Sequence, residues 1–213
     1  MIFPLQAPPY NRKRCDKYAF YSDSIANYFE FLQTVTDEML RVTKRYVFLN
    51  IQKNYYNKKD VFDLIGHYSD KIVEIIIWEK SNPMPASGHN VTNAYEFFIV
   101  LGDQPIKANG TYIKNHLTTS VNSKMPKNHK AVMKEEVCDW FIKNFTKEGD
   151  MILDPFMGLG TTAICAKKAN RHYIGSEISE EYYRESLDRI NGECKQFTIF
   201  DYTQEPNGQL SFG

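Results

Sequence analysis

A nine-residue segment, Asp154 to Thr162, lies between an apolar run and a stretch with the composition of a helix. It reads Asp-Pro-Phe-Met-Gly-Leu-Gly-Thr-Thr, and the apolar run before it is Met151 to Leu153. A strand, a tight turn and a helix in this order form the nucleotide-type cofactor site of α/β proteins. Gly158 and Gly160 permit a positive φ angle and close approach of the backbone to a ligand. The segment therefore predicts a site for a small polar cofactor.

The residues around the glycines narrow the kind of cofactor. A phosphate-binding loop of the GxxxxGK[ST] type needs a lysine, which the segment lacks. Gly158, Gly160 and Ala163 do satisfy the dinucleotide pattern GxGxx[GA], so this pattern leaves a nicotinamide cofactor open.

A second candidate strand follows the segment and ends in a carboxylate. It runs from Tyr173 to Ile178 and contains Glu177. An ionised Glu accepts two hydrogen bonds, which suits the two hydroxyls of a ribose. Taken alone, Glu177 is equally compatible with the start of a solvated helix.

The whole segment resembles the S-adenosylmethionine motif DPFxGxGTT of DNA amino-methyltransferases. The resemblance implies that Asp154 faces the amino-acid part of the cofactor and that Glu177 binds its ribose. A candidate strand from Phe197 to Asp201 would place Asp201 near the adenine, although a trailing tail is the alternative. The implied cofactor-binding residues are Asp154, Pro155, Phe156, Gly158, Gly160, Thr161, Thr162, Glu177 and Asp201.

A second motif, Ala7-Pro8-Pro9-Tyr10-Asn11, lies near the start of the chain. It resembles the catalytic motif [DNS]PP[YFW] of the same family. There, a polar side chain and a proline carbonyl accept hydrogen bonds from the target amine, which favours its nucleophilic geometry. The aromatic ring stacks on the extruded base. Pro8, Pro9 and Tyr10 match this pattern.

Ala7 departs from the motif, because a methyl group accepts no hydrogen bond. Two explanations stay open: a natural enzyme that has lost or altered its activity, or a deliberate inactivating substitution of Asp, Ser or Asn at this position. The departure predicts impaired catalysis beside an intact cofactor site.

The order of the motifs, catalytic first and cofactor last, resembles the permuted β class of the family. Trp78 to Pro85 resembles its segment W-x-K-x-N-P-x-P, and Tyr95-Glu96 and His129-Lys130 resemble its neighbouring elements. Singly, Trp78 is better explained as a core aromatic residue and His129 as a surface residue. The resemblance implies a Rossmann-like methyltransferase fold of the α/β class, circularly permuted, with a mostly parallel sheet and helices on both faces.

Periodicity predicts alternating elements and one domain over 1–213. Within that domain, we expect a target-recognition insertion at 103–130 and a cofactor-binding half at 131–201. The predicted helices are 24–42 with a cap at Ser22 or Asp23, 58–67, 134–144 and 163–170, and the predicted strands are 2–5, 46–51, 72–78, 95–101, 151–153 and 173–178.

The net charge of the chain is zero, so the prediction of a DNA substrate depends on local clusters of basic residues. The stretch 104–134 has six lysines and no acidic residue, and a solvated loop is its alternative explanation. Local basic excess is what phosphate contacts require. The recognition stretch is short, which favours a homodimer that grips the duplex with two subunits. The predicted nucleic-acid contacts are Arg12, Lys13, Arg14, Lys114, Lys124 and Lys127.

The remaining composition excludes other classes. The four cysteines have no metal-ligand spacing, so we expect free thiols and no metal. No run of 18 apolar residues and no signal peptide is found, so we expect no membrane contact and a cytoplasmic location.

These features predict a DNA methyltransferase that uses S-adenosylmethionine and modifies an exocyclic amine, with adenine N6 favoured over cytosine N4. The alternatives are an inactive DNA- and cofactor-binding protein of the same fold and, less favoured, a nicotinamide-dependent oxidoreductase.

Overall fold

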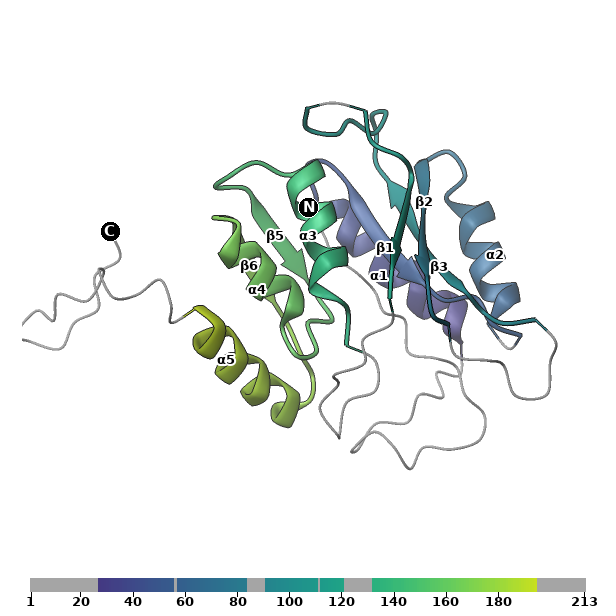
Figure 1. Cartoon of the computed structure of the whole chain (residues 1–213). Coiled ribbons are helices and arrows are strands. Elements are labelled where there is room, and N and C mark those ends of the chain that lie inside the picture. The colour runs from purple at the N-terminus through teal and green to yellow at the C-terminus, as the bar shows by residue number, and fades with distance from the viewer. Residues whose placement is uncertain (1–26, 56, 84–90, 111, 121–131, 195–213) are drawn as a thin grey trace, which may run out of the picture.

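The structure is a computed structural model that describes residues 27–55, 57–83, 91–110, 112–120 and 132–194 (Figure 1). Helices and strands alternate along most of this length, as the periodicity predicts. The elements are α1 (Tyr28–Val42), β1 (Val47–Ile51), α2 (Lys58–His67), β2 (Ile72–Lys80), β3 (Tyr95–Leu101), β4 (His116–Thr119), α3 (Glu135–Phe145), β5 (Met151–Asp154), α4 (Thr161–Lys168), β6 (His172–Gly175) and α5 (Glu180–Cys194).

The described strands form a four-stranded sheet in the order β1-β3-β2-β4 and a parallel pair of β5 and β6. β3 is antiparallel to both β1 and β2, and β4 is parallel to β2, so β1, β2 and β4 run the same way. β5 runs with them in Figure 1, where both β1 and β5 end toward the lower edge of the sheet. Every described strand except β3 thus shares one direction, in agreement with the predicted fold.

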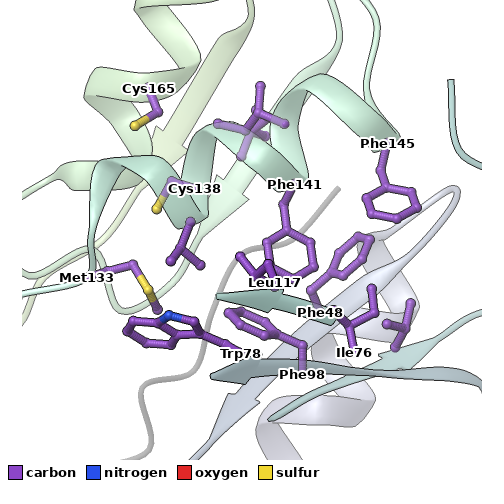
Figure 2. Close-up of a cluster of buried hydrophobic side chains, with 14 of the residues drawn as sticks. Phe48, Ile76, Trp78, Phe98, Leu117, Met133, Cys138, Phe141, Phe145 and Cys165 are labelled. Carbon is purple, nitrogen blue, oxygen red and sulfur yellow. The ribbon is translucent and has the colours of Figure 1, made fainter. Parts of the chain in front are cut away.

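One face of the sheet packs against α3 in an aromatic core. Phe141 of α3 lies 4.2 Å from Phe98 of β3 and 5.2 Å from Phe48 of β1, measured between ring centroids. Figure 2 shows these rings gathered beneath the helix. Close aromatic pairs of this kind stabilise the fold beyond the area that they bury.

The other face carries α1 and α2. Val47, Leu49 and Ile51 alternate with Phe48 along β1 and pack with the buried residues of these two helices, such as Leu32 and Leu64. The period-2 alternation of a strand therefore divides β1 between the two cores. Helices on both faces agree with the prediction.

Several boundaries differ from the prediction. The predicted cap Ser22 or Asp23 is wrong for α1, because Asn27 caps it by accepting from the Glu30 amide (3.2 Å). β6 ends at Gly175, and α4 begins at Thr161 rather than Ala163. The sequence reasoning missed β4 and α5, which have weak local signals and are held by partners distant in the sequence. The predicted strands 2–5 and 197–201 lie outside the described residues.

Within the described ranges, no helix combines the length and the apolar character that crossing a membrane demands.

Candidate cofactor site

The glycine-bearing loop follows β5 and leads directly into α4. Gly158 and Gly160 adopt φ angles of +51° and +74°, in the left-handed region that side chains with a Cβ rarely adopt. Gly160 is the N-cap residue of α4. The two glycines thus make the sharp turn that aims the amino end of a helix at the loop, as their spacing predicts.

Backbone hydrogen bonds tie this loop to the end of β6. Met157 N donates to Ser176 O (2.9 Å), and Ser176 N donates to Asp154 O (3.1 Å). The Ser176 hydroxyl donates to Pro155 O (2.7 Å). The neighbouring strand end therefore holds the loop through Ser176, a residue that the sequence reasoning did not name as part of the site.

Glu177 reaches the glycine loop directly. Its Oε2 accepts from Gly158 N (2.9 Å), and its Oε1 accepts from Ser179 N (2.9 Å). Each carboxylate oxygen has a further lone pair available for a ligand. The structure thus brings together Gly158 and Glu177, two residues of the predicted set that are distant in the sequence.

Asp154 lies at the end of β5 and is buried, with 5% of its surface exposed. Burial raises the pKa of its carboxyl to about 6, and the charge of Glu177 adds to the rise. Hydrogen bonds from Thr162 and from the Phe156 amide (3.1 Å) act in the opposite direction on the pKa. The carboxyl group of Asp154, predicted to bind the cofactor, therefore has a pKa close to neutral pH.

The remaining loop residues are packed to different degrees. Thr161 and Thr162 are buried, and Thr162 Oγ1 lies 4.0 Å from Cys138 Sγ of α3. Phe156 is half-buried and meets Phe31 of α1 edge to face, with 6.1 Å between ring centroids. The two threonines thus contribute to helix packing in addition to their predicted role, which stays a prediction.

α5 closes against the same loop. Arg189 Nη1 donates to Leu159 O (2.6 Å). A Cβ at Gly160 would lie 3.1 Å from Ile190 Cδ1, and a Cβ at Gly175 would clash with Met157 Sδ. Gly175 and Arg189 are supporting residues that sequence reasoning missed. For Gly175, the available signal was a glycine directly before Ser176 and Glu177. For Arg189 of α5, the sequence offers no such signal.

A second polar group occupies the carboxyl ends of β2 and β4. Lys80 pairs with Glu96 at 2.5 Å, and their side chains are 12% and 7% exposed. The Trp78 Nε1–H donates to the Thr119 hydroxyl (2.9 Å). Trp78 is buried in the aromatic core, so its interpretation as a core residue is confirmed.

Lys114 does not lie beside the glycine loop. It precedes the amino end of β4, in the 102–115 connection at the upper end of Figure 1, whereas β5 ends toward the lower edge. There it lines a cavity of about 560 Å³ with Lys107, Tyr112, Trp140 and other residues. The range 103–130 therefore includes β4, a strand of the sheet.

The other predicted site residues lie outside the described residues, namely Ala7, Pro8, Pro9, Tyr10, Arg12, Lys13, Arg14, Lys124, Lys127 and Asp201. Among the residues that the structure does describe, no three His, Cys, Asp or Glu side chains are grouped as metal ligands.

Comparison with known proteins supplies independent findings. The family model described as DNA methylase matches residues 5–188. The type II methyltransferase M.MwoI of Methanothermobacter wolfeii is 33% identical over 187 residues, which cover 78% of this chain and 28% of that protein. The type II methyltransferase M2.DpnII of Streptococcus pneumoniae is 32% identical over 140 residues, with 58% and 52% covered. The chain thus spans about half the length of these relatives or less.

Solved structures share the fold. PvuII DNA methyltransferase (cytosine-N4-specific) superimposes with a TM-score of 0.70 at 15% identity, over 92% of this chain and 84% of that one. The M1.HpyAVI–SAM complex gives 0.61 at 23% identity, over 79% and 85%. At these identities the likeness is evidence for the Rossmann-like methyltransferase fold.

Proposed function

Since the chain belongs to the DNA methylase family, we propose that it transfers a methyl group from S-adenosylmethionine to an exocyclic amine of a DNA base. The observation that carries this proposal is the hydrogen bond from Gly158 N to the Glu177 carboxylate, beside the buried Asp154. It joins the two carboxylates and the glycine turn of the predicted cofactor motif in one place.

The loop has the features that this cofactor requires. Among the described residues, a Cβ at Gly158 would meet no atom within 4 Å, so the turn leaves its backbone uncovered by them. Glu177 keeps lone pairs for ribose hydroxyls, and Asp154 offers a carboxylate to the cationic amino-acid part. When bound, the cofactor supplies an electrophilic methyl group on a sulfonium.

Methyl transfer in this proposal is a direct displacement that needs positioning rather than a covalent enzyme intermediate. The amine nitrogen lone pair forms the new N–C bond while the S–C bond breaks and its electrons pass to sulfur. The amine then loses a proton to water. Pro8 and Tyr10 would hold the extruded base through a carbonyl acceptor and ring stacking.

Adenine N6 is the favoured target and cytosine N4 the second, because the motif reads Pro-Pro-Tyr-Asn. Ala7 supplies no acceptor, and loss of one preorganised contact costs about 2.7–4 kcal/mol of barrier. That observation favours a second candidate function, a DNA- and cofactor-binding protein of low turnover.

Incorporation of radiolabelled methyl groups tests the proposal, with unmethylated DNA and RNA as substrates and nucleoside analysis of the product. We expect labelled DNA, with N6-methyladenine above N4-methylcytosine, and a higher rate in Ala7→Asp and Ala7→Ser. Ala7→Val is the matched control, because it changes the same side chain without an acceptor. If Ala7→Asp binds the cofactor yet labels no DNA, the catalytic proposal is wrong and the binding function stands.

DNA and a second subunit are the proposed partners. Sedimentation equilibrium with and without a DNA duplex measures the assembly state. A monomer in both conditions contradicts the homodimer without affecting the proposed reaction.

A further inference from the structure

We propose that Asn50 contacts the target base, with its carboxamide accepting a hydrogen bond from the exocyclic amine and donating one to the adjacent ring nitrogen. The inference rests on the proposed function and assigns a specificity residue outside both sequence motifs. Asn50 is the penultimate residue of β1.

The strand alternation places Asn50 on the same sheet face as Asp154. On β1, Phe48 belongs to the core beneath α3 and Leu49 to the core on the opposite face, so Asn50 returns to the α3 face. On β5, Ile152 belongs to the core beneath α3, and Leu153 packs against the core on the opposite face. The next residue, Asp154, therefore also lies on the α3 face.

Both residues also lie at the same edge of the sheet. β1 and β5 run together, and Asn50 and Asp154 stand at or next to their carboxyl ends. Ligands of open α/β sheets bind at the carboxyl ends of the strands. Asn50 is therefore placed on the face and edge where a base must meet the cofactor.

The described polar side chains named below share this face and edge and have partners, except Asn50. Lys80 and Glu96 pair with each other, Thr119 accepts from Trp78, and Asp154 accepts from the Phe156 amide. Asn50 is 1% exposed, and among the described residues neither atom of its carboxamide has a hydrogen-bond partner. A buried amide left unpaired is unfavourable in a fold and requires an explanation, of which a ligand role is one.

The chemistry of a carboxamide fits the proposed substrate. Adenine presents its N6 amine next to the acceptor N1, and cytosine presents its N4 amine next to the acceptor N3. An asparagine offers one acceptor and one donor side by side, which matches either edge. Its oxygen would also supply the side-chain acceptor that the methyl group of Ala7 lacks.

Asn50→Leu and Asn50→Asp test this inference in the full chain. Leucine is similar in size and removes both hydrogen-bonding atoms, so we expect labelling of unmethylated DNA to fall by about 100-fold. Affinity for S-adenosylmethionine should stay unchanged, and the melting temperature should stay equal or rise because an unpaired polar group is removed. Asn50→Asp keeps the acceptor and should retain more activity than Asn50→Leu.

Thr43→Val is the matched control, because the Thr43 hydroxyl is also buried and unpartnered among the described residues but precedes the amino end of β1. It should keep full labelling. If Asn50→Leu labels DNA like the wild type, the inference is overturned while the proposed function stands. If wild type and Ala7→Asp both bind the cofactor and neither labels DNA, the proposed function fails and this inference fails with it. Should Asn50→Leu not fold, Asn50→Asp decides. Reduced labelling by Asn50→Asp supports the inference, and full labelling overturns it.

Discussion

At the scale of single residues, Asp154 owes its chemistry to its surroundings. An exposed aspartate ionises far below neutral pH, but this one is buried at the end of β5 beside Glu177. Both influences disfavour the charged form and raise the pKa of the carboxyl. A carboxylate in that state gains most from a cationic ligand such as a sulfonium cofactor bearing an ammonium group.

Asp154 makes stability depend on pH in an unusual direction. Its pKa is about 6 in the folded protein against an ordinary value of 3.8, so the folded state holds the proton more tightly. Its contribution to stability is present in full below about pH 4 and is lost as pH rises through about 6, by roughly 3 kcal/mol. Urea unfolding of Asp154→Asn between pH 4 and 7 should therefore lack this loss. Asp188→Asn, at an exposed position on α5, should follow the wild type.

Equal pH profiles for the wild type and Asp154→Asn would contradict this assignment of the raised pKa.

Both carboxylate oxygens of Glu177 accept hydrogen bonds, so we expect glutamine to be a poor replacement. Glutamine has one acceptor oxygen and must leave the amide of Gly158 or of Ser179 unpaired. Hydrogen bonds to a charged group contribute about 1.5–3 kcal/mol, so we expect Glu177→Gln to weaken S-adenosylmethionine binding about 10- to 100-fold in calorimetry. Glu180→Gln is the control, because Glu180 is exposed and pairs only across the surface of α5. Unchanged affinity in Glu177→Gln would remove Glu177 from the site.

At the scale of elements, the loop between β5 and α4 depends on two glycines that differ in their surroundings. Gly158 and Gly160 both have positive φ, but only Gly160 faces the packed side chains of α5. The two positions therefore separate the conformational demand of the turn from the packing demand of the helix.

Alanine at the two positions should destabilise the protein to different extents. The left-handed conformation alone costs roughly 1–2 kcal/mol for a residue with a Cβ, which is the loss we expect for Gly158→Ala. In Gly160→Ala the new Cβ would also lie 3.1 Å from Ile190 and 3.2 Å from Ser186. Overpacking of these contacts should add a further loss of about 1–3 kcal/mol. Urea unfolding without ligand measures both. Equal losses would show that α5 moves freely away from the loop.

The pair of Lys80 and Glu96 joins β2 to β3 in a buried setting. Removing one partner leaves the other charge buried, so Lys80→Met should cost about 3–5 kcal/mol of unfolding free energy. The double variant Lys80→Met/Glu96→Gln should regain a large part of that loss. Lys59→Met breaks an exposed pair with Asp63 on α2 and should cost less than about 1 kcal/mol. Additive losses in the double variant would argue against an ion pair.

At the scale of the whole molecule, the two ends of the sheet carry different surfaces. The carboxyl edge holds the glycine loop, Asn50 and the Lys80–Glu96 pair, whereas the 102–115 connection with its cavity lies at the other end. A cofactor bound at the carboxyl edge as proposed would contact α4 and the ends of β5 and β6, so it should stabilise the fold as a unit.

Ligand-dependent unfolding distinguishes the two cofactor classes. S-adenosylmethionine at 100 times its dissociation constant should add about 2.7 kcal/mol to the free energy of unfolding. NAD at the same concentration should add nothing measurable, because the proposed binding through Asp154 and Glu177 belongs to an amino-methyltransferase motif. Thermal and urea unfolding with each ligand give the comparison. Stabilisation by NAD alone would support the oxidoreductase alternative.

Local patterns in the sequence determined most of the element order and the position of the cofactor loop. The spacing of apolar side chains predicted α2 at its observed bounds, and the glycines predicted the turn before α4, because periodicity and positive φ are properties of neighbouring residues. β4 escaped prediction because its four residues are held by pairing with β2. α5 escaped because its polar composition gives little signal before it packs on the loop.

Only the tertiary structure decided how the site is assembled. It joined Glu177 to Gly158, buried Asp154 enough to raise its pKa, and left Asn50 unpaired on the face that Asp154 shares. The sequence by itself named the cofactor motif through residue types and spacing. Burial, pairing and strand direction depend on contacts between residues far apart in the chain, so no local pattern contains them.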